Sequence, residues 1–285
     1  MKILVTGYTG QLGYDVVHEG LKRGFEMIGV GSKDLNITDE QSVFQYINEV
    51  KPHAIVHCAA FTAVDKAEDD NENCWNVNVK GTQYLANAAK IVNARFMYIS
   101  TDYVFDGLGE LPFSEIDAPN PVGYYGMTKY EGEKVVQSLL ADWFIIRISW
   151  VFGLNGNNFI RTMLRLAENR SELNVVGDQV GSPTNTFDLS RLLLDIIQTD
   201  RYGIYHATNE GFCSWAEFAK EIFRLAGKDV RVNSITTEEY PTRAVRPKNS
   251  RMSKQKLIEN GFKPLPSWQN SLDHYIKQLL HEVKS

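Results

Sequence analysis

The sequence predicts a doubly wound α/β protein, in which helices cover both faces of a parallel sheet, with a smaller α/β lobe toward the C-terminus. Three observations indicate this class. Short β-branched and apolar runs recur through the first half of the chain, longer amphipathic stretches separate them, and a glycine-rich segment directly follows the first run. Buried strands joined by helices require right-handed crossovers and therefore form a parallel sheet.

The expected elements follow in chain order. Strands are expected at residues 3–5, 27–30, 54–57, 95–99 and 144–148. Beyond residue 150 the pattern is less regular, with a helix near 158–168, a strand near 173–176, a helix near 188–198 and a strand at 203–207. Two further helices are expected at 214–226, introduced by a serine N-cap, and at 268–281.

These elements predict two units. Residues 1–153 are expected to form a dinucleotide-binding unit, and residues 154–285 mainly a substrate-binding lobe. Part of 185–207 is expected to return to the first unit. Ligands of open α/β sheets bind outside the carboxyl ends of the strands, so we expect the lobe to close over that edge.

The composition indicates a small-molecule ligand. The formal net charge is -5 and the basic residues are scattered, which argues against nucleic acid and anionic membrane as partners. No run of eighteen apolar residues occurs, and the three cysteines have no C-x-x-C spacing. We therefore expect a cytoplasmic protein without a disulfide framework.

A glycine-rich turn follows the first predicted strand. Gly7, Gly10 and Gly13 let the backbone turn tightly and bring the N–H groups of a helix to a pyrophosphate. Small Ala59 and Ala60 follow the third strand, where a cofactor ribose would approach the backbone. A turn that only packs helix against strand is the alternative, but the position after the first strand favours cofactor binding.

The end of the second predicted strand lacks the acid that usually binds the ribose of NAD. Ser32 and Lys33 stand there instead, and their hydroxyl and ammonium groups suit a 2′-phosphate. The sequence thus predicts a preference for NADPH, with NADH possible if Lys33 is only solvated. Asp34 and Leu35 follow and are expected to border the adenine.

A tyrosine and a lysine four residues apart form the candidate catalytic pair. Tyr125 and Lys129 project from the same face of a predicted helix. An ammonium near a phenol lowers its pKa from about 10 toward the working pH. Thr101 ends the fourth strand, where its hydroxyl would polarise a substrate carbonyl. An exposed helix face with an unrelated tyrosine and lysine is the alternative for the pair alone.

Eight segments together resemble one enzyme family. They read T-G-Q-L-G (9–13), C-A-A-F-T-A-V-D-K-A-E (58–68), I-S-T-D-Y-V-F-D-G (99–107), Y-G-M-T-K (125–129), S-W-V-F-G (149–153), N-N-F (157–159), D-Q-V-G-S-P-T (178–184) and R-P-K-N-S (246–250). The chain resembles the extended short-chain dehydrogenase/reductases, which have a Rossmann-like fold, and within them the dTDP-4-dehydrorhamnose reductase branch.

The resemblance implies roles residue by residue. Tyr125 matches the proton donor, Thr101 the group that bonds the C4 carbonyl, and Lys129 the residue that binds the nicotinamide ribose. With the positions discussed above, the cofactor-binding residues are expected to be Gly7, Thr9, Gly10, Gln11, Leu12, Gly13, Ser32, Lys33, Asp34, Leu35, Ala59, Ala60, Phe61, Thr62, Tyr125 and Lys129. The residues expected to bind a nucleotide sugar are Val64, Thr101, Asp102, Tyr125, Trp150, Asn158, Gln179 and Arg246.

The implied reaction is the NADPH-dependent reduction of dTDP-4-dehydro-β-L-rhamnose to dTDP-β-L-rhamnose, the last step of dTDP-rhamnose biosynthesis. Two alternatives stay open: another nucleotide-sugar enzyme, such as a different 4-ketoreductase, an epimerase or a dehydratase, and a non-catalytic regulatory subunit of methionine adenosyltransferase. Some family members bind magnesium at a dimer interface. Only Asp15 lies near one such position, so we expect no metal and either a monomer or a homodimer.

Overall fold

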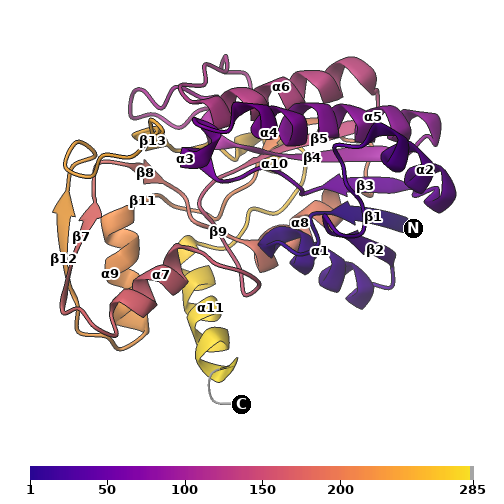
Figure 1. Ribbon diagram of the computed structural model, residues 1–285. Coiled ribbons are helices and arrows are strands. Elements are labelled where there is room, and N and C mark those ends of the chain that lie inside the picture. The colour runs from indigo at the N-terminus through magenta and orange to yellow at the C-terminus, as the bar shows by residue number, and fades with distance from the viewer. Residues whose placement is uncertain (283–285) are drawn as a thin grey trace.

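The structure is a computed structural model that describes residues 1–282. Within these residues, six parallel strands form the main sheet (Figure 1). From edge to edge they are β10 (Gly203–His206), β5 (Trp143–Ile148), β4 (Arg95–Thr101), β3 (Ala54–His57), β1 (Lys2–Thr6) and β2 (Glu26–Val30). All of their pairings are parallel, as the buried apolar runs predict.

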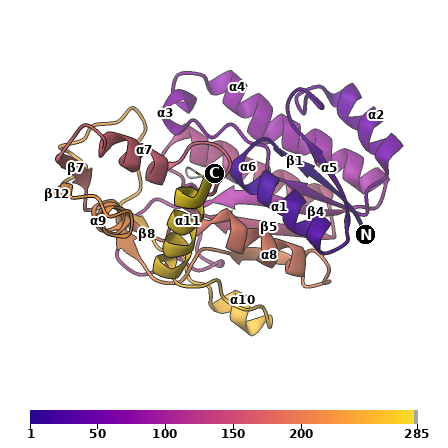
Figure 2. The same ribbon diagram turned by 90° about the horizontal axis from the view of Figure 1, so that it is seen from below.

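Helices cover both faces of this sheet, which confirms the predicted fold class. Helices α2 (Glu40–Val50), α5 (Thr82–Ile91) and α6 (Tyr124–Leu139) lie on one face, and α1 (Gln11–Lys22) and α8 (Thr186–Ile196) lie on the other (Figures 1 and 2). Side chains of β1 alternate between the two cores, since Ile3 and Val5 pack toward α1 and α8 whereas Leu4 packs toward α2 and α5.

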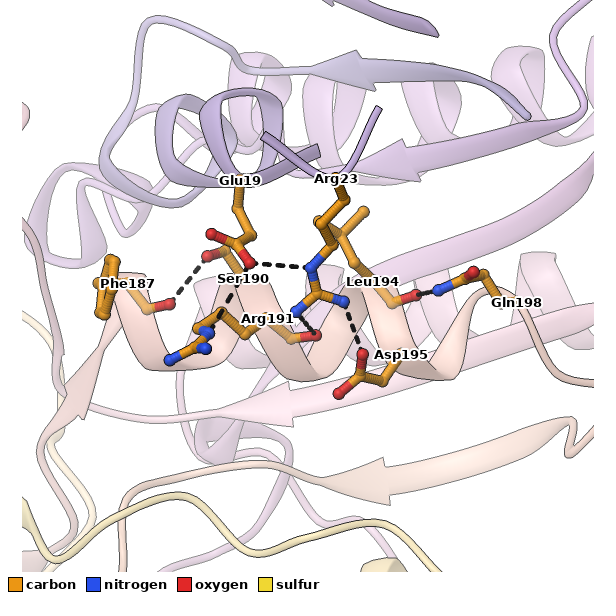
Figure 3. Close-up of polar contacts among 8 residues, drawn as sticks. All are labelled: Glu19, Arg23, Phe187, Ser190, Arg191, Leu194, Asp195 and Gln198. Atoms are coloured by element: carbon orange, nitrogen blue, oxygen red, sulfur yellow. Dashed lines mark hydrogen bonds and ion pairs between the residues drawn. The ribbon is translucent and has the colours of Figure 1, made fainter. Parts of the chain in front are cut away.

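Helices α1 and α8 lie side by side and are joined by a group of ion pairs (Figure 3). Arg23 donates from Nε to Glu19 at 2.8 Å and from Nη1 to Asp195 at 2.6 Å. Arg191 lies 3.7 Å from the same glutamate. These groups are partly exposed, so each pair contributes no more than about 1 kcal/mol, and the apolar residues beneath them hold the helices together.

The second half of the chain builds a smaller lobe with its own core. It contains a parallel pair, β7 (Glu172–Val176) and β12 (Arg231–Ile235), and a small sheet in the order β11 (Cys213–Ser214), β8 (Val180–Gly181), β13 (Asn249–Ser250). Helices α7 (Phe159–Leu166), α9 (Trp215–Leu225) and α11 (Trp268–Glu282) pack around them. Ser214 caps α9 in a capping box with Glu217, which confirms the predicted serine N-cap.

Short elements complete the described chain. They are α3 (Val64–Ala67), α4 (Asn71–Trp75), the π-helix η1 (Asn76–Gly81), the 3-10 helix η2 (Asp102–Val104), the paired β6 (Val151–Phe152) and β9 (Thr184–Asn185), and α10 (Gln255–Glu259). Every predicted strand and helix is present within two residues of its expected ends. In residues 1–282, no helix is both long and apolar enough to cross a membrane.

The chain returns from the lobe to the main sheet. After β9 it forms α8, which packs on α1, and then β10, which pairs with β5 at the sheet edge. The core on the α1 and α8 side of the sheet therefore includes residues from distant parts of the chain, such as Ile3 and Leu265. The division of the chain at residue 153 stays a prediction.

Candidate active site

A cavity of about 810 Å³ lies along the carboxyl ends of the parallel strands. Each of the first five strands of the chain contributes to its wall, because these ends meet at the same edge of the sheet. The lining residues at or directly after these strand ends are Thr6, Val30, Cys58, Thr101 and Ile148.

The glycine-rich turn forms one end of this cavity. Gly7 has φ +72°, a conformation that favours glycine, and a Cβ there would lie 2.7 Å from the backbone nitrogen of Ala59. A Cβ on Gly13 would overlap the carbonyl of Gly7. Helix α1 begins at Gln11 and has no side-chain cap, so its first N–H groups are available to a ligand. Backbone N–H groups and the helix dipole at this end suit a diphosphate, so the turn fits a dinucleotide.

Of the four residues 32–35 that follow β2, only some contribute to the cavity wall. Ser32 and Leu35 line it, whereas the exposed Lys33 stands at its margin. The carboxylate of Asp34 turns back and accepts a hydrogen bond from the backbone N–H of Gly31 at 2.8 Å. Asp34 therefore shapes the turn, and Leu35 contributes to the cavity wall at this end.

The segment after β3 forms the middle of the wall with Ala59, Ala60, Phe61 and Thr62. Its backbone is held by Asn78, which is buried in η1. Asn78 Oδ1 accepts from the N–H of Phe61 at 2.8 Å, and its Nδ2 donates to the carbonyl of Phe61 at 3.2 Å. The sequence interpretation did not include Asn78, and no short motif in the sequence around it indicates this role.

The three candidate catalytic residues lie together in this cavity. Thr101 ends β4, and its hydroxyl accepts from the N–H of Tyr103 at 3.2 Å. Tyr125 and Lys129 project from α6. The N-terminus of this helix is fixed by Glu68, whose carboxylate accepts from the N–H of Tyr124 at 2.8 Å. The hydrogen bond from Tyr124 to Glu68 thus fixes the first turn of α6, which carries Tyr125.

Burial controls the charges of the pair. It raises the pKa of Tyr125, and the nearby Asp102 raises it further, while a hydrogen bond with Thr101 opposes both effects. Burial also lowers the pKa of Lys129 to about 7, against the field of Glu133. The pKa of Tyr125 therefore lies above its usual value, opposite to the expected direction, because burial and the charge of Asp102 both raise it. The phenol stays protonated at neutral pH.

A buried ion pair lies one helical turn beyond Lys129. Glu133 accepts from Arg147 Nη2 at 2.7 Å and Nε at 2.9 Å, and from the hydroxyl of Ser100 at 2.5 Å. Both charged side chains are almost fully buried, with exposures of 1% and 0%. The network joins α6, β4 and β5, so it fastens the elements that carry Thr101, Tyr125 and Lys129.

Asp102 is buried beside the candidate catalytic residues and lines the cavity. Burial raises the pKa of its carboxyl to about 6, while hydrogen bonds with Ser250 and Thr101 lower it. The hydroxyl of Thr101 donates to Asp102 Oδ1 at 3.1 Å. The carboxyl group therefore changes charge within the physiological range.

A second cavity, of about 1130 Å³, lies between the sheet edge and the smaller lobe. It shares Tyr103 and Trp150 with the first cavity, so the two are continuous there. Gln179 and Arg246 line it, while Val64 lines the first cavity close to the junction.

Arg246 is held by neighbours from the first half of the chain. It forms an ion pair with Asp65 at 2.6 Å and donates to the hydroxyl of Tyr103 at 3.1 Å. Its side chain is only 28% exposed, in contrast to a surface arginine. The guanidinium is therefore oriented within the second cavity.

Asn158 is placed elsewhere than expected. It caps α7, and its amide donates to Gln11, Gly153 and Tyr275 at 3.0, 2.9 and 3.1 Å. The side chain is therefore committed to a polar network under the glycine-rich turn. Through Gln11 Oε1, which also accepts from the N–H of Gly153, this network connects α1 to the start of the smaller lobe.

Further residues of the second cavity were missed by the sequence interpretation. They come from α7, β7, α9 and the segment after β12, where no short motif brings them together. The most prominent are Arg170, Trp215 and Tyr240. In the described chain, residues 1–282, no cluster of three or more His, Cys, Asp or Glu side chains is arranged to hold a metal ion.

The glycine-rich turn, the sheet edge and the Thr101, Tyr125, Lys129 constellation define an extended short-chain dehydrogenase/reductase. The model of one family, the RmlD substrate binding domain, matches residues 1–281, and the chain belongs to this family.

Several relatives and solved structures in this family are named dTDP-4-dehydrorhamnose reductase. The dTDP-4-dehydrorhamnose reductase from Aggregatibacter actinomycetemcomitans is 42% identical over 285 residues, which cover 95% of this chain and 97% of the relative. The crystal structure of such a reductase from Clostridium acetobutylicum is 44% identical, covers 98% of this chain and 100% of that one, and has a TM-score of 0.96. The reductase from Bacillus anthracis, solved in complex with NADP, is 41% identical, covers 97% and 99%, and has a TM-score of 0.95.

Proposed function

We propose that the chain is an NADPH-dependent reductase that converts dTDP-4-dehydro-β-L-rhamnose to dTDP-β-L-rhamnose. The observation that carries this proposal is the position of Tyr125. A protonated, buried phenol lies in the glycine-cradled cavity close to where Tyr103 and Trp150 join it to a second cavity that contains an oriented arginine. A nucleotide sugar would place its diphosphate near Arg246 and its sugar at the junction.

The residues divide the chemistry between them. When bound along the first cavity, NADPH supplies the hydride that reduces C4 of the sugar. Tyr125 donates its proton to the oxygen on C4, and the hydroxyl of Thr101 shares the negative charge that develops there. Because burial raises the pKa of Tyr125, the proton is present at neutral pH, as reduction requires. Lys129 orients the nicotinamide ribose, and Asp102 accepts hydrogen bonds from sugar hydroxyls.

The preference for NADPH rests on the end of β2. Ser32 lines the cavity there, the exposed Lys33 is free to turn toward a phosphate, and the carboxylate of Asp34 is engaged by its own backbone. A 2′-phosphate would therefore meet a hydroxyl and an ammonium and would avoid direct repulsion. We expect a lower KM for NADPH than for NADH, and Lys33→Ala should reduce the difference.

The test follows NADPH oxidation with the ketosugar made in situ. dTDP-glucose is converted by a 4,6-dehydratase and a 3,5-epimerase, and the reaction is run with and without the epimerase. Turnover that needs the epimerase, with dTDP-rhamnose as the product, supports the proposal.

Other outcomes separate the alternatives. Equal turnover without the epimerase indicates a reductase of the 4-keto-6-deoxyglucose nucleotide instead. Conversion of dTDP-glucose by the protein alone, with neither auxiliary enzyme present and no NADPH consumed, indicates an epimerase or dehydratase. Absence of turnover despite NADPH binding, together with co-purification of methionine adenosyltransferase, favours a regulatory subunit.

A further inference from the structure

Trp150 has an unusual backbone conformation at the junction of the two cavities. It directly follows Ser149, beyond the end of β5, and has φ +48°, in the left-handed region that a bulky residue rarely adopts. Such conformations persist only where the surroundings hold them, and they are concentrated at functional sites. The question is which contacts hold Trp150.

Two elements of the smaller lobe contact the Trp150 indole. Trp215, the first residue of α9, stacks on it with ring centroids 3.6 Å apart and an interplanar angle of 13°. Gly181 in β8 leaves room for it, since a Cβ there would lie 2.9 Å from Trp150 Cε2. Strand β8 pairs with β11, which leads directly into Trp215, so the two contacts belong to one rigid unit.

The stack continues into the core of the lobe. Phe159 of α7 lies against Trp215 with centroids 4.6 Å apart, and it stacks on Phe218 of α9 at 5.8 Å. Trp215 lines only the second cavity, whereas Trp150 lines both. The indole of Trp150 thus connects the aromatic stack of the lobe to the catalytic cavity.

We propose that Trp215 is a positioning residue that, with the space provided by Gly181, holds the Trp150 indole at the cavity junction and so fixes the sugar against Tyr125. The inference rests on the proposed function, since the sugar is the ligand that lies there. Trp215 acts through Trp150, and its contribution is the orientation of the reacting carbon. Small misplacements matter in this position, because about 1 Å can change a rate about a hundredfold.

The test uses variants from two different elements. Trp215→Leu removes the stacking partner, and Gly181→Ala displaces the indole while leaving Trp215 intact. We expect each to lower kcat for the ketosugar by about tenfold or more, with the Kd of NADPH unchanged within about twofold. Trp215→Phe keeps an aromatic partner and should restore most of kcat. Trp143→Phe, at the opposite end of β5, is the matched control and should keep wild-type kinetics.

A spectroscopic signature reports the geometry without any substrate. Two indoles stacked at 3.6 Å should give a coupled pair of circular dichroism bands of opposite sign, which Trp215→Leu and Trp215→Phe abolish and Gly181→Ala weakens. Trp143→Phe should retain the pair.

The possible failures are distinguishable. A wild-type protein without the band pair overturns the inference, and so does a Trp215→Leu variant that loses the pair and keeps full kcat. If Trp215→Leu raises only KM and Gly181→Ala changes nothing, Trp215 contacts the nucleotide directly and the positioning role is refuted. A wild-type protein that shows the band pair but no turnover of any ketosugar refutes the proposed function instead.

Discussion

Replacing Glu133 with leucine should destabilise the protein far more than a typical substitution. The change removes three hydrogen bonds, from Arg147 Nε, Arg147 Nη2 and the hydroxyl of Ser100. It leaves the guanidinium of Arg147 charged and 1% exposed, with no carboxylate. Removing one partner of a buried ion pair costs about 3–5 kcal/mol, because the remaining charge stays desolvated.

The assay is equilibrium unfolding in urea, checked by thermal melting. For a chain of 285 residues the unfolding entropy at the midpoint is about 0.6 kcal/mol/K, so the expected loss lowers the Tm by about 5–8 °C. The matched control is the double variant Glu133→Leu with Arg147→Met, which removes both charges. It should recover most of the lost stability, because an apolar pair of similar volume replaces the ion pair.

The relative stabilities of the single and double variants test the cost of the unpaired charge. A single variant that is as stable as wild type would refute the proposed cost of an unpaired buried guanidinium. A double variant that is less stable than the single variant would show that the network stabilises through packing and not through compensated charge. An unchanged urea m-value is needed for either comparison, since it shows that the same surface unfolds.

Three further results are expected. Tyr125→Phe should lower kcat by about 10²–10⁴-fold with NADPH affinity unchanged, measured by single-turnover kinetics and fluorescence titration, and retained turnover would mean that another group donates the proton. Gly13→Ala should weaken NADPH binding and lower the Tm, since its Cβ overlaps the carbonyl of Gly7; a wild-type thermal shift with NADPH would contradict this. Because the pKa of Asp102 is raised to about 6, its carboxylate is lost as pH falls through 6, so KM for the ketosugar should rise there in wild type and stay flat in Asp102→Asn.

Most of the sheet could be predicted because its strands are buried on both faces. Runs such as 54–57 and 144–148 are then mainly apolar, and each contains one buried polar or charged residue, His57 and Arg147. The glycine-rich turn could also be predicted from the sequence. A Cβ on Gly7 would be too close to the backbone of Ala59, just after β3, and a Cβ on Gly13 would be too close to the carbonyl of Gly7, so both positions require glycine. At these positions, residues that are close in the sequence indicate the local structure.

The rest depended on contacts between distant segments. Trp215 meets Trp150 only after the chain has folded back through β8 and β11, so its aromatic signal alone indicates a helix in a core. The pKa of Tyr125 was expected to fall because Lys129 is four residues away, but the degree of burial, which decides the direction, comes from the surrounding elements. Asn158 was assigned by resemblance, and its partner Tyr275 lies 117 residues away.

The late return of the chain to its first sheet has a consequence during protein synthesis. Strand β10 is the edge partner of β5, yet it emerges from the ribosome only after the chain of the smaller lobe as far as α8 has been made. The core under the sheet also waits for Phe262 and Leu265. Apolar side chains on the α1 and α8 face of the sheet therefore remain partly uncovered on the nascent chain until translation is nearly finished, and such transiently exposed apolar surface favours aggregation.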